Sequence, residues 1–169
     1  MKSLNTFQGV AVCASRSLIL TAYRSRSSAI SGSAGLRRGS ASDKVLAYSA
    51  RLIDLMATKK KPANVRQEDW EKKKAYYTGT AHWITGNIYI NQNRFVLADS
   101  ALRAALPLLS QNHPSSASIL FYLGWSNYKL EHYAEAVHFF KQCMAIPGQF
   151  QELAIKNLVV IHNEQGIQD

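Results

Sequence analysis

Residues 117–148 read ASILFYLGWSNYKLEHYAEAVHFFKQCMAIPG, and this stretch predicts how the chain folds. Apolar side chains recur at helical spacing up to Leu130, and a second run of the same kind begins at Tyr133 and reaches Met144. The Pro-Gly pair that closes the stretch ends the second run, because proline cannot continue a helix and glycine tolerates the turn. Two amphipathic helices joined by a short turn form an antiparallel helical hairpin.

Side-chain size in this stretch predicts close packing between its two helices. Gly124 and Ala136 are small, as expected where two helices cross closely, whereas Tyr133 and Phe140 are large and fill the space between them. One hairpin cannot bury its apolar face alone, so we expect neighbouring helices to stack on it.

The spacing of these residues resembles the tetratricopeptide repeat family. The family pattern has a large apolar residue, Leu-Gly, an aromatic residue, Ala-x3-Phe and then proline. The corresponding residues here are Leu120, Leu123-Gly124, Tyr128 (one position late), Ala136-x3-Phe140 and Pro147.

A weaker copy of the pattern precedes this hairpin. It contains His82, Gly86 and Tyr89, followed by Ala98-x3-Leu102. Gly86 and Ala98 each lie 38 positions before their counterparts in the stronger copy, which exceeds the family period of about 34. We therefore expect extra residues after Leu102, with Pro107 ending the helix near residue 106.

Further helices complete the predicted organisation. Ser42 and Asp43 indicate a helix start, and apolar residues then recur on one face to about residue 57. Acidic residues open a long helix over 67–91, which is followed by a partner helix over 94–110. A last helix over 149–165 resembles half of a third repeat that caps the array. We thus predict N-terminal capping helices over 43–78, and repeats with a C-terminal capping helix over 79–169.

Residues 1–42 differ from the rest in composition. They hold six Lys and Arg, ten serines and no Asp or Glu, which is typical of a disordered basic leader. An organellar transit peptide is the alternative, because such peptides are rich in Arg and Ser and poor in acids. We expect a soluble, cytoplasmic protein, or an organellar one if the leader is a transit peptide. No apolar run is long enough to predict a transmembrane segment.

The resemblance implies an all-α fold of antiparallel helix-hairpin repeats, stacked as a short right-handed α-solenoid. It also implies a non-enzymatic protein–protein interaction module, in which the first helices line a concave groove for a peptide or a partner protein. Packing of Phe121 and Trp125 against flanking helices is an equal alternative for those two rings. The implied groove residues are Trp83, Asn87, Ile90, Phe121, Trp125, Tyr128 and Lys129.

Nothing in the sequence predicts a catalytic site, a cofactor or a metal site. The five histidines form no pair at i, i+4 and no H-E-x-x-H motif, and there is no Gly-rich phosphate loop. Cys143 lies where a small buried residue is expected, so we predict a buried thiol.

Two other functions compete with the interaction module. The chain could be the structural or truncated C-terminal end of a larger array, which would leave an apolar face exposed near residues 45–56. The clusters Lys59–Lys61 and Lys72–Lys74 fit solvated helix ends, or alternatively a site for an anionic polymer or a membrane surface. Residues 75–169 carry five Lys and Arg against six Asp and Glu, so we expect no specific binding of nucleic acid by the repeats.

Overall fold

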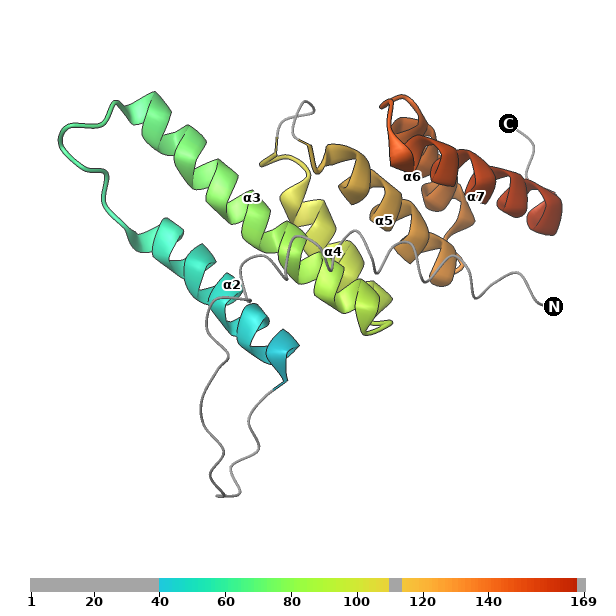
Figure 1. Ribbon diagram of the computed structural model, residues 1–169, viewed down its shortest axis with the longest axis horizontal. Helices are drawn as coiled ribbons and strands as arrows, with labels where there is room; N and C mark the ends of the chain where they lie inside the picture. Colours follow the sequence, from blue (N-terminus) through green and yellow to red (C-terminus); the bar gives the residue numbers. More distant parts are fainter. Residues whose placement is uncertain (1–39, 110–113, 167–169) are drawn as a thin grey trace, which may run out of the picture. The chain divides into compact units, whose positions relative to one another are not determined.

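The computed structural model describes residues 40–109 and 114–166, and these residues form an all-α fold. Each helix packs against the next one along the chain (Figure 1). The helix α5 also contacts α3 and α7. The six helices of the described residues are α2 (Ala41–Thr58), α3 (Gln67–Asn91), α4 (Phe95–Ala105), α5 (Ser116–Lys129), α6 (Tyr133–Met144) and α7 (Gln149–Gln165).

The first described helix begins two residues before the predicted start. Its N-cap is Ser40, not Ser42, because Asp43 stands three residues after Ser40 and completes a capping box. The backbone N–H of Asp43 donates to Ser40 Oγ at 3.2 Å, and the Ser40 N–H donates to Asp43 Oδ2 at 2.7 Å. The predicted leader otherwise lies outside the described residues.

The other predicted helices are confirmed with small shifts at their ends. The long helix α3 spans Gln67–Asn91 as predicted, so the predicted boundary between residues 78 and 79 falls within one continuous helix. The helix α4 ends at Ala105, ahead of Pro107, whose ring is incompatible with the next helical turn. The helix α7 ends at Gln165 and is capped by Gly166, whose φ of 61° places it in the left-handed region that favours glycine.

The same turn joins α3 to α4 and α5 to α6. Asn93 and Glu131 occupy the left-handed region with φ of 57° and 63°. In the first turn Arg94 N–H donates to the Tyr89 carbonyl at 2.9 Å, and in the second His132 N–H donates to the Asn127 carbonyl at the same distance. Corresponding residues lie 38 positions apart, so the register predicted from Gly86 and Gly124 describes two copies of one hairpin.

The glycines have the same packing role in both hairpins. A Cβ on Gly86 would lie 2.6 Å from Leu102 Cγ, and a Cβ on Gly124 would lie 2.7 Å from Phe140 Cδ1. Leu102 and Phe140 are fully buried. Each glycine therefore lets the first helix of its hairpin approach the large residue that lies 16 positions later on the second helix.

The longer connection between the two hairpins packs on α3. Leu109, which follows α4, is buried, and its Cγ would lie 2.8 Å from a Cβ on Gly79. The extra residues predicted after Leu102 thus contribute an apolar contact of their own. No helix of the described residues is long and apolar enough to cross a membrane.

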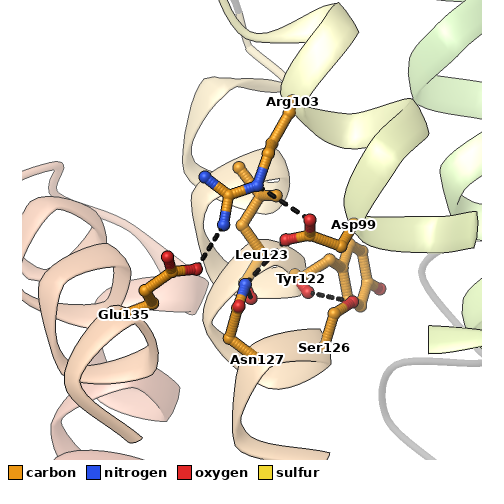
Figure 2. A network of polar contacts seen from close by, with 7 residues as sticks. All are labelled: Asp99, Arg103, Tyr122, Leu123, Ser126, Asn127 and Glu135. Carbon is orange, nitrogen blue, oxygen red and sulfur yellow. Dashed lines mark hydrogen bonds and ion pairs between the residues drawn. The ribbon is translucent and has the colours of Figure 1, made fainter. Parts of the chain in front are cut away.

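A polar network links the two hairpins (Figure 2). The buried amide of Asn127 on α5 donates to Asp99 Oδ1 on α4 at 2.7 Å and to the Leu123 carbonyl at 2.9 Å. Arg103 Nε donates to Asp99 Oδ2 at 2.8 Å, and its Nη2 donates to Glu135 on α6. The hydrogen bond with Asp99 is the main cause that raises the pKa of Arg103. Three successive helices are therefore joined by charge-assisted hydrogen bonds.

Asp99 is the member of this network whose loss should matter most. Replacing Asp99 with alanine leaves a buried N–H of Asn127 without its acceptor, so we expect unfolding to require about 1–3 kcal/mol less free energy. Glu135→Ala is the matched control, because its exposed ion pair contributes about 1 kcal/mol or less. Urea unfolding of both variants measures the difference, and equal losses would contradict the importance of the buried amide.

Candidate interaction face

The predicted groove residues lie on α3 and α5, which contact each other. Trp83, Asn87 and Ile90 share one side of α3, because they are spaced three or four positions apart. Trp125 and Tyr128 share one side of α5 for the same reason. We call these five residues, together with Lys129, the interaction face.

A hydrogen bond joins the two helices at Trp83. The Trp83 indole Nε1 donates to Ser118 Oγ at 3.1 Å, and the Ser118 hydroxyl in turn donates to the Ser115 carbonyl at 2.7 Å. Trp83 remains half-buried while Ser118 is buried. The indole is thus held in one orientation with part of its ring accessible, which is a favourable condition for a binding anchor.

Trp125, Tyr128 and Lys129 form one cluster at the C-terminal end of α5. The Trp125 and Tyr128 ring centroids are 5.8 Å apart, and Lys129 Nζ lies 4.6 Å from the Trp125 centroid and 5.4 Å from that of Tyr128. Both rings are half-buried and Lys129 is exposed. Such cation–π contacts pre-order a long lysine side chain that would otherwise lose entropy on binding.

Tyr128 also connects this cluster to α7. Its hydroxyl donates to Glu164 Oε2 at 2.8 Å, and its ring meets Tyr133 edge to face at 6.1 Å between centroids. Burial, and then the hydrogen bond to Glu164, raise the pKa of Tyr128 to about 12. The phenol therefore stays protonated as a donor, and it fixes the position of its ring relative to the last helix.

Phe121 occupies a different environment from the other predicted groove residues. It is only 5% exposed, and its ring lies 5.7 Å from that of Phe140 and 5.4 Å from that of Phe150. Packing against flanking helices, the alternative left open for this ring, is what the structure shows. Phe121 therefore supports α5 from within the core, while Trp125 keeps accessible ring area.

Two buried oxygen atoms on α3 lack hydrogen-bond partners among the described residues. They are Asn87 Oδ1 and Thr80 Oγ1, which stand on either side of Trp83 along the same side of the helix. Asn87 is 7% exposed. A buried polar atom left unpaired costs about 1–3 kcal/mol, so a ligand that supplies N–H donors here would recover part of that cost. The sequence indicated the position of Asn87 but contained no signal for its missing partner.

Within residues 40–109 and 114–166, no group of three or more His, Cys, Asp or Glu side chains could hold a metal ion. Cys143 is the buried thiol predicted from the sequence, and burial raises its pKa to about 12. Its Sγ lies 3.3 Å from the Ala117 carbonyl oxygen, so the thiol stays neutral and contributes to packing between α5 and α6.

Comparison of the chain with protein-family models, curated proteins and solved structures found no match. What the interaction face can bind is therefore inferred from its own geometry. That face combines three half-buried aromatic rings, one exposed lysine and a buried amide oxygen that has no hydrogen-bond partner within residues 40–109 and 114–166.

Proposed function

We propose that this chain is a non-enzymatic protein-interaction module of the tetratricopeptide-repeat type, in which hairpins stack as a short right-handed α-solenoid. Its ligand is an extended peptide, or an extended segment of a partner protein, that lies along the interaction face. The repeated turn, the repeated glycine contact and the contacts of α5 with both α3 and α7 support this architecture.

The unpaired Asn87 oxygen is the observation that carries the proposal. An extended peptide presents backbone N–H groups that no internal structure occupies, and such a group can donate to a buried amide oxygen. Thr80 Oγ1 offers a second acceptor on the same side of α3. Both oxygens lack donors among the described residues and both are buried, so a peptide N–H reaches them when neighbouring side chains move aside on binding.

The aromatic rings supply the apolar part of the same site. Tryptophan and tyrosine dominate binding energy in protein interfaces, because they give large contact areas at low cost in side-chain entropy. Trp83, Trp125 and Tyr128 are each held by a hydrogen bond or a ring contact, yet each keeps accessible surface. Lys129 adds a positive charge at the end of α5, which favours a ligand with an acidic group there.

The test uses the full-length chain as bait for a displayed library of random peptides. Selected peptides are synthesised with a fluorophore, and their affinities are measured by anisotropy for the parent and for a Trp125→Ala, Tyr128→Ala variant. We expect the variant to bind about 10- to 100-fold more weakly. A Tyr48→Ala, Leu55→Ala variant is the control, because these exposed side chains lie on α2, outside the interaction face.

Peptide chemistry then tests the role of Asn87. Methylation of one backbone nitrogen removes one N–H donor, and we expect a single methylated position to bind about tenfold more weakly than its neighbours. If circular dichroism shows both protein variants folded and both lose peptide affinity equally, the assignment of the interaction face is overturned. A methylation scan without any sensitive position would overturn pairing with Asn87.

A further inference from the structure

All of the net charge of the described helical domain lies in one segment. Residues 40–58 carry two Lys and Arg and two Asp and Glu, and residues 78–166 carry five of each. Residues 59–77 carry seven Lys and Arg against three Asp and Glu. This segment comprises the connection between α2 and α3 and the first part of α3, which Figure 1 shows away from α5, α6 and α7.

The acidic side chains of this segment are already engaged. Glu68 pairs with Lys72 at 2.6 Å, and Asp69 pairs with Arg66 at 2.7 Å. Glu71 accepts a hydrogen bond from Gln67 Nε2 at 2.9 Å. Two of the three acids therefore neutralise near neighbours, Arg66 and Lys72, while Glu71 is engaged by a neutral amide. Among the described residues, the other lysines of the segment have no ion pair.

Five lysines of the segment remain outside these ion pairs. Lys74 is half-buried, and we call the other four the basic tip: Lys59, Lys60, Lys61 and Lys73. All four are exposed, and none has an acidic partner in the part of the chain that the structure describes. Lys61 Nζ donates to the carbonyls of Pro62 and Val65, at 3.2 and 2.6 Å, which orders the connection without neutralising the charge.

Two tyrosines stand beside the basic tip. Tyr76 and Tyr77 follow Lys73 by three and four positions, so they lie on its side of α3. Tyr76 is 49% exposed and Tyr77 is 37% exposed, and their ring centroids are 5.5 Å apart. Exposed tyrosine next to lysine suits the headgroup region of a bilayer, where the ring meets apolar atoms and the hydroxyl meets water.

We propose that the basic tip is a docking site for the surface of an anionic phospholipid bilayer. Lysine acts as a point charge on a flexible stem, so it matches a diffuse array of headgroup phosphates and carboxylates and needs no fixed geometry. The one arginine of the segment, which could make forked contacts to a nucleic-acid phosphate, is paired with Asp69. A bilayer surface is flat, so the connection between α2 and α3 can contact it without a binding groove in the protein. The observations thus favour a membrane surface over a nucleic acid.

The experiment compares two full-length variants of equal net charge. The tip variant loses three charges at the basic tip, through Lys59→Gln, Lys60→Gln and Lys73→Gln. The matched variant loses three exposed charges elsewhere, through Lys44→Gln, Lys141→Gln and Lys156→Gln. Both keep residues 1–39 with their own basic side chains, so any contribution of that segment is common to both. Circular dichroism confirms that each variant is folded.

Binding is measured by co-sedimentation with phosphatidylcholine vesicles, with and without about one third phosphatidylserine. Each lysine near an anionic surface strengthens partitioning about fivefold, so we expect the tip variant to bind anionic vesicles about 100-fold more weakly than the parent. The matched variant should lose less than about fivefold. Binding of the parent should weaken steeply as salt shortens the screening length.

Three results would overturn the proposal. An equal loss of vesicle affinity in the two variants would show that only the total charge of the protein matters. Equal binding of the parent to vesicles with and without phosphatidylserine would show that headgroup charge is not recognised. A single-stranded oligonucleotide that binds the parent more tightly than anionic vesicles, and loses affinity only with the tip variant, would assign the basic tip to nucleic acid.

Discussion

Replacing Phe140 with alanine should lower the free energy of unfolding by about 3–5 kcal/mol, the range for loss of a buried phenylalanine. Phe140 is fully buried on α6, packs closely against Gly124 of α5, and lies 5.7 Å from the Phe121 ring. Removing its ring deletes apolar contacts and leaves a cavity that the neighbouring helix backbone cannot fill. A domain of this size has about 5–15 kcal/mol of stability, so the loss is a large share of the total.

Urea unfolding followed by far-ultraviolet circular dichroism measures this change. Val96→Ala is the control, because Val96 is 66% exposed on α4, and such substitutions change stability by about 0.5 kcal/mol. A loss at Phe140 no larger than the loss at Val96 would show that the α5–α6 contact does not stabilise the fold.

Replacing Gly124 with alanine should destabilise the parent but stabilise the Phe140→Ala variant. The new Cβ would lie 2.7 Å from both Cδ1 and Cε1 of Phe140, and the ring is fully buried and cannot move aside without shifting a helix. Overpacking of this kind costs about 1–3 kcal/mol. Alanine is otherwise better than glycine within a helix by about 1 kcal/mol. When the ring is absent, only the gain in helix propensity remains.

A double-mutant cycle over Gly124 and Phe140 measures the reversal of sign. The four proteins are unfolded under identical conditions, and the coupling energy is the difference between the effects of Gly124→Ala in the two backgrounds. We expect a coupling of about 2 kcal/mol. The same effect in both backgrounds would mean that the glycine is present for some reason other than close approach of the two helices.

Local sequence signals predicted the hairpins well. Pro107, Pro147 and Gly166 act through backbone geometry that is the same in any fold, so the ends of α4, α6 and α7 fall near them. The small size of Gly124 and the large size of Phe140 predicted that both lie between the two helices, and the structure shows them in close contact there. The 38-residue register predicted from two glycines and two alanines is repeated in the turns at Asn93 and Glu131.

Contacts between hairpins were not predictable in the same way. Asp99 and Asn127 lie 28 positions apart, and their hydrogen bond depends on how α4 and α5 pack after the long connection between the two hairpins. The contact of Leu109 with Gly79 has the same origin. The burial of Phe121 and the unpaired oxygen of Asn87 depend on which neighbouring helices cover α5 and α3. Residue spacing within one helix does not indicate which other helices will pack against it.

The first helix start was missed for a smaller reason. Ser40 and Ser42 are both good N-cap residues, and the acid next to Ser42 made it the natural choice. The capping box requires three residues of separation, which only the pair Ser40 and Asp43 provides. The three-residue spacing between the N-cap serine and its acidic partner predicts the helix start better than an acid directly after the serine.

The linear order of helix contacts has a consequence for native-state opening. The helix α5 is supported by α3, α4, α6 and α7, whereas α2 packs chiefly on α3. In an array where each element is stabilised mainly by its neighbours, the least supported end exchanges its amide hydrogens through local unfolding, while the centre exchanges only when the whole domain opens. The two proposed surfaces therefore differ in rigidity. The aromatic rings of the interaction face lie on α5, which we expect to open last. The lysines between α2 and α3 lie next to α2, which we expect to open first.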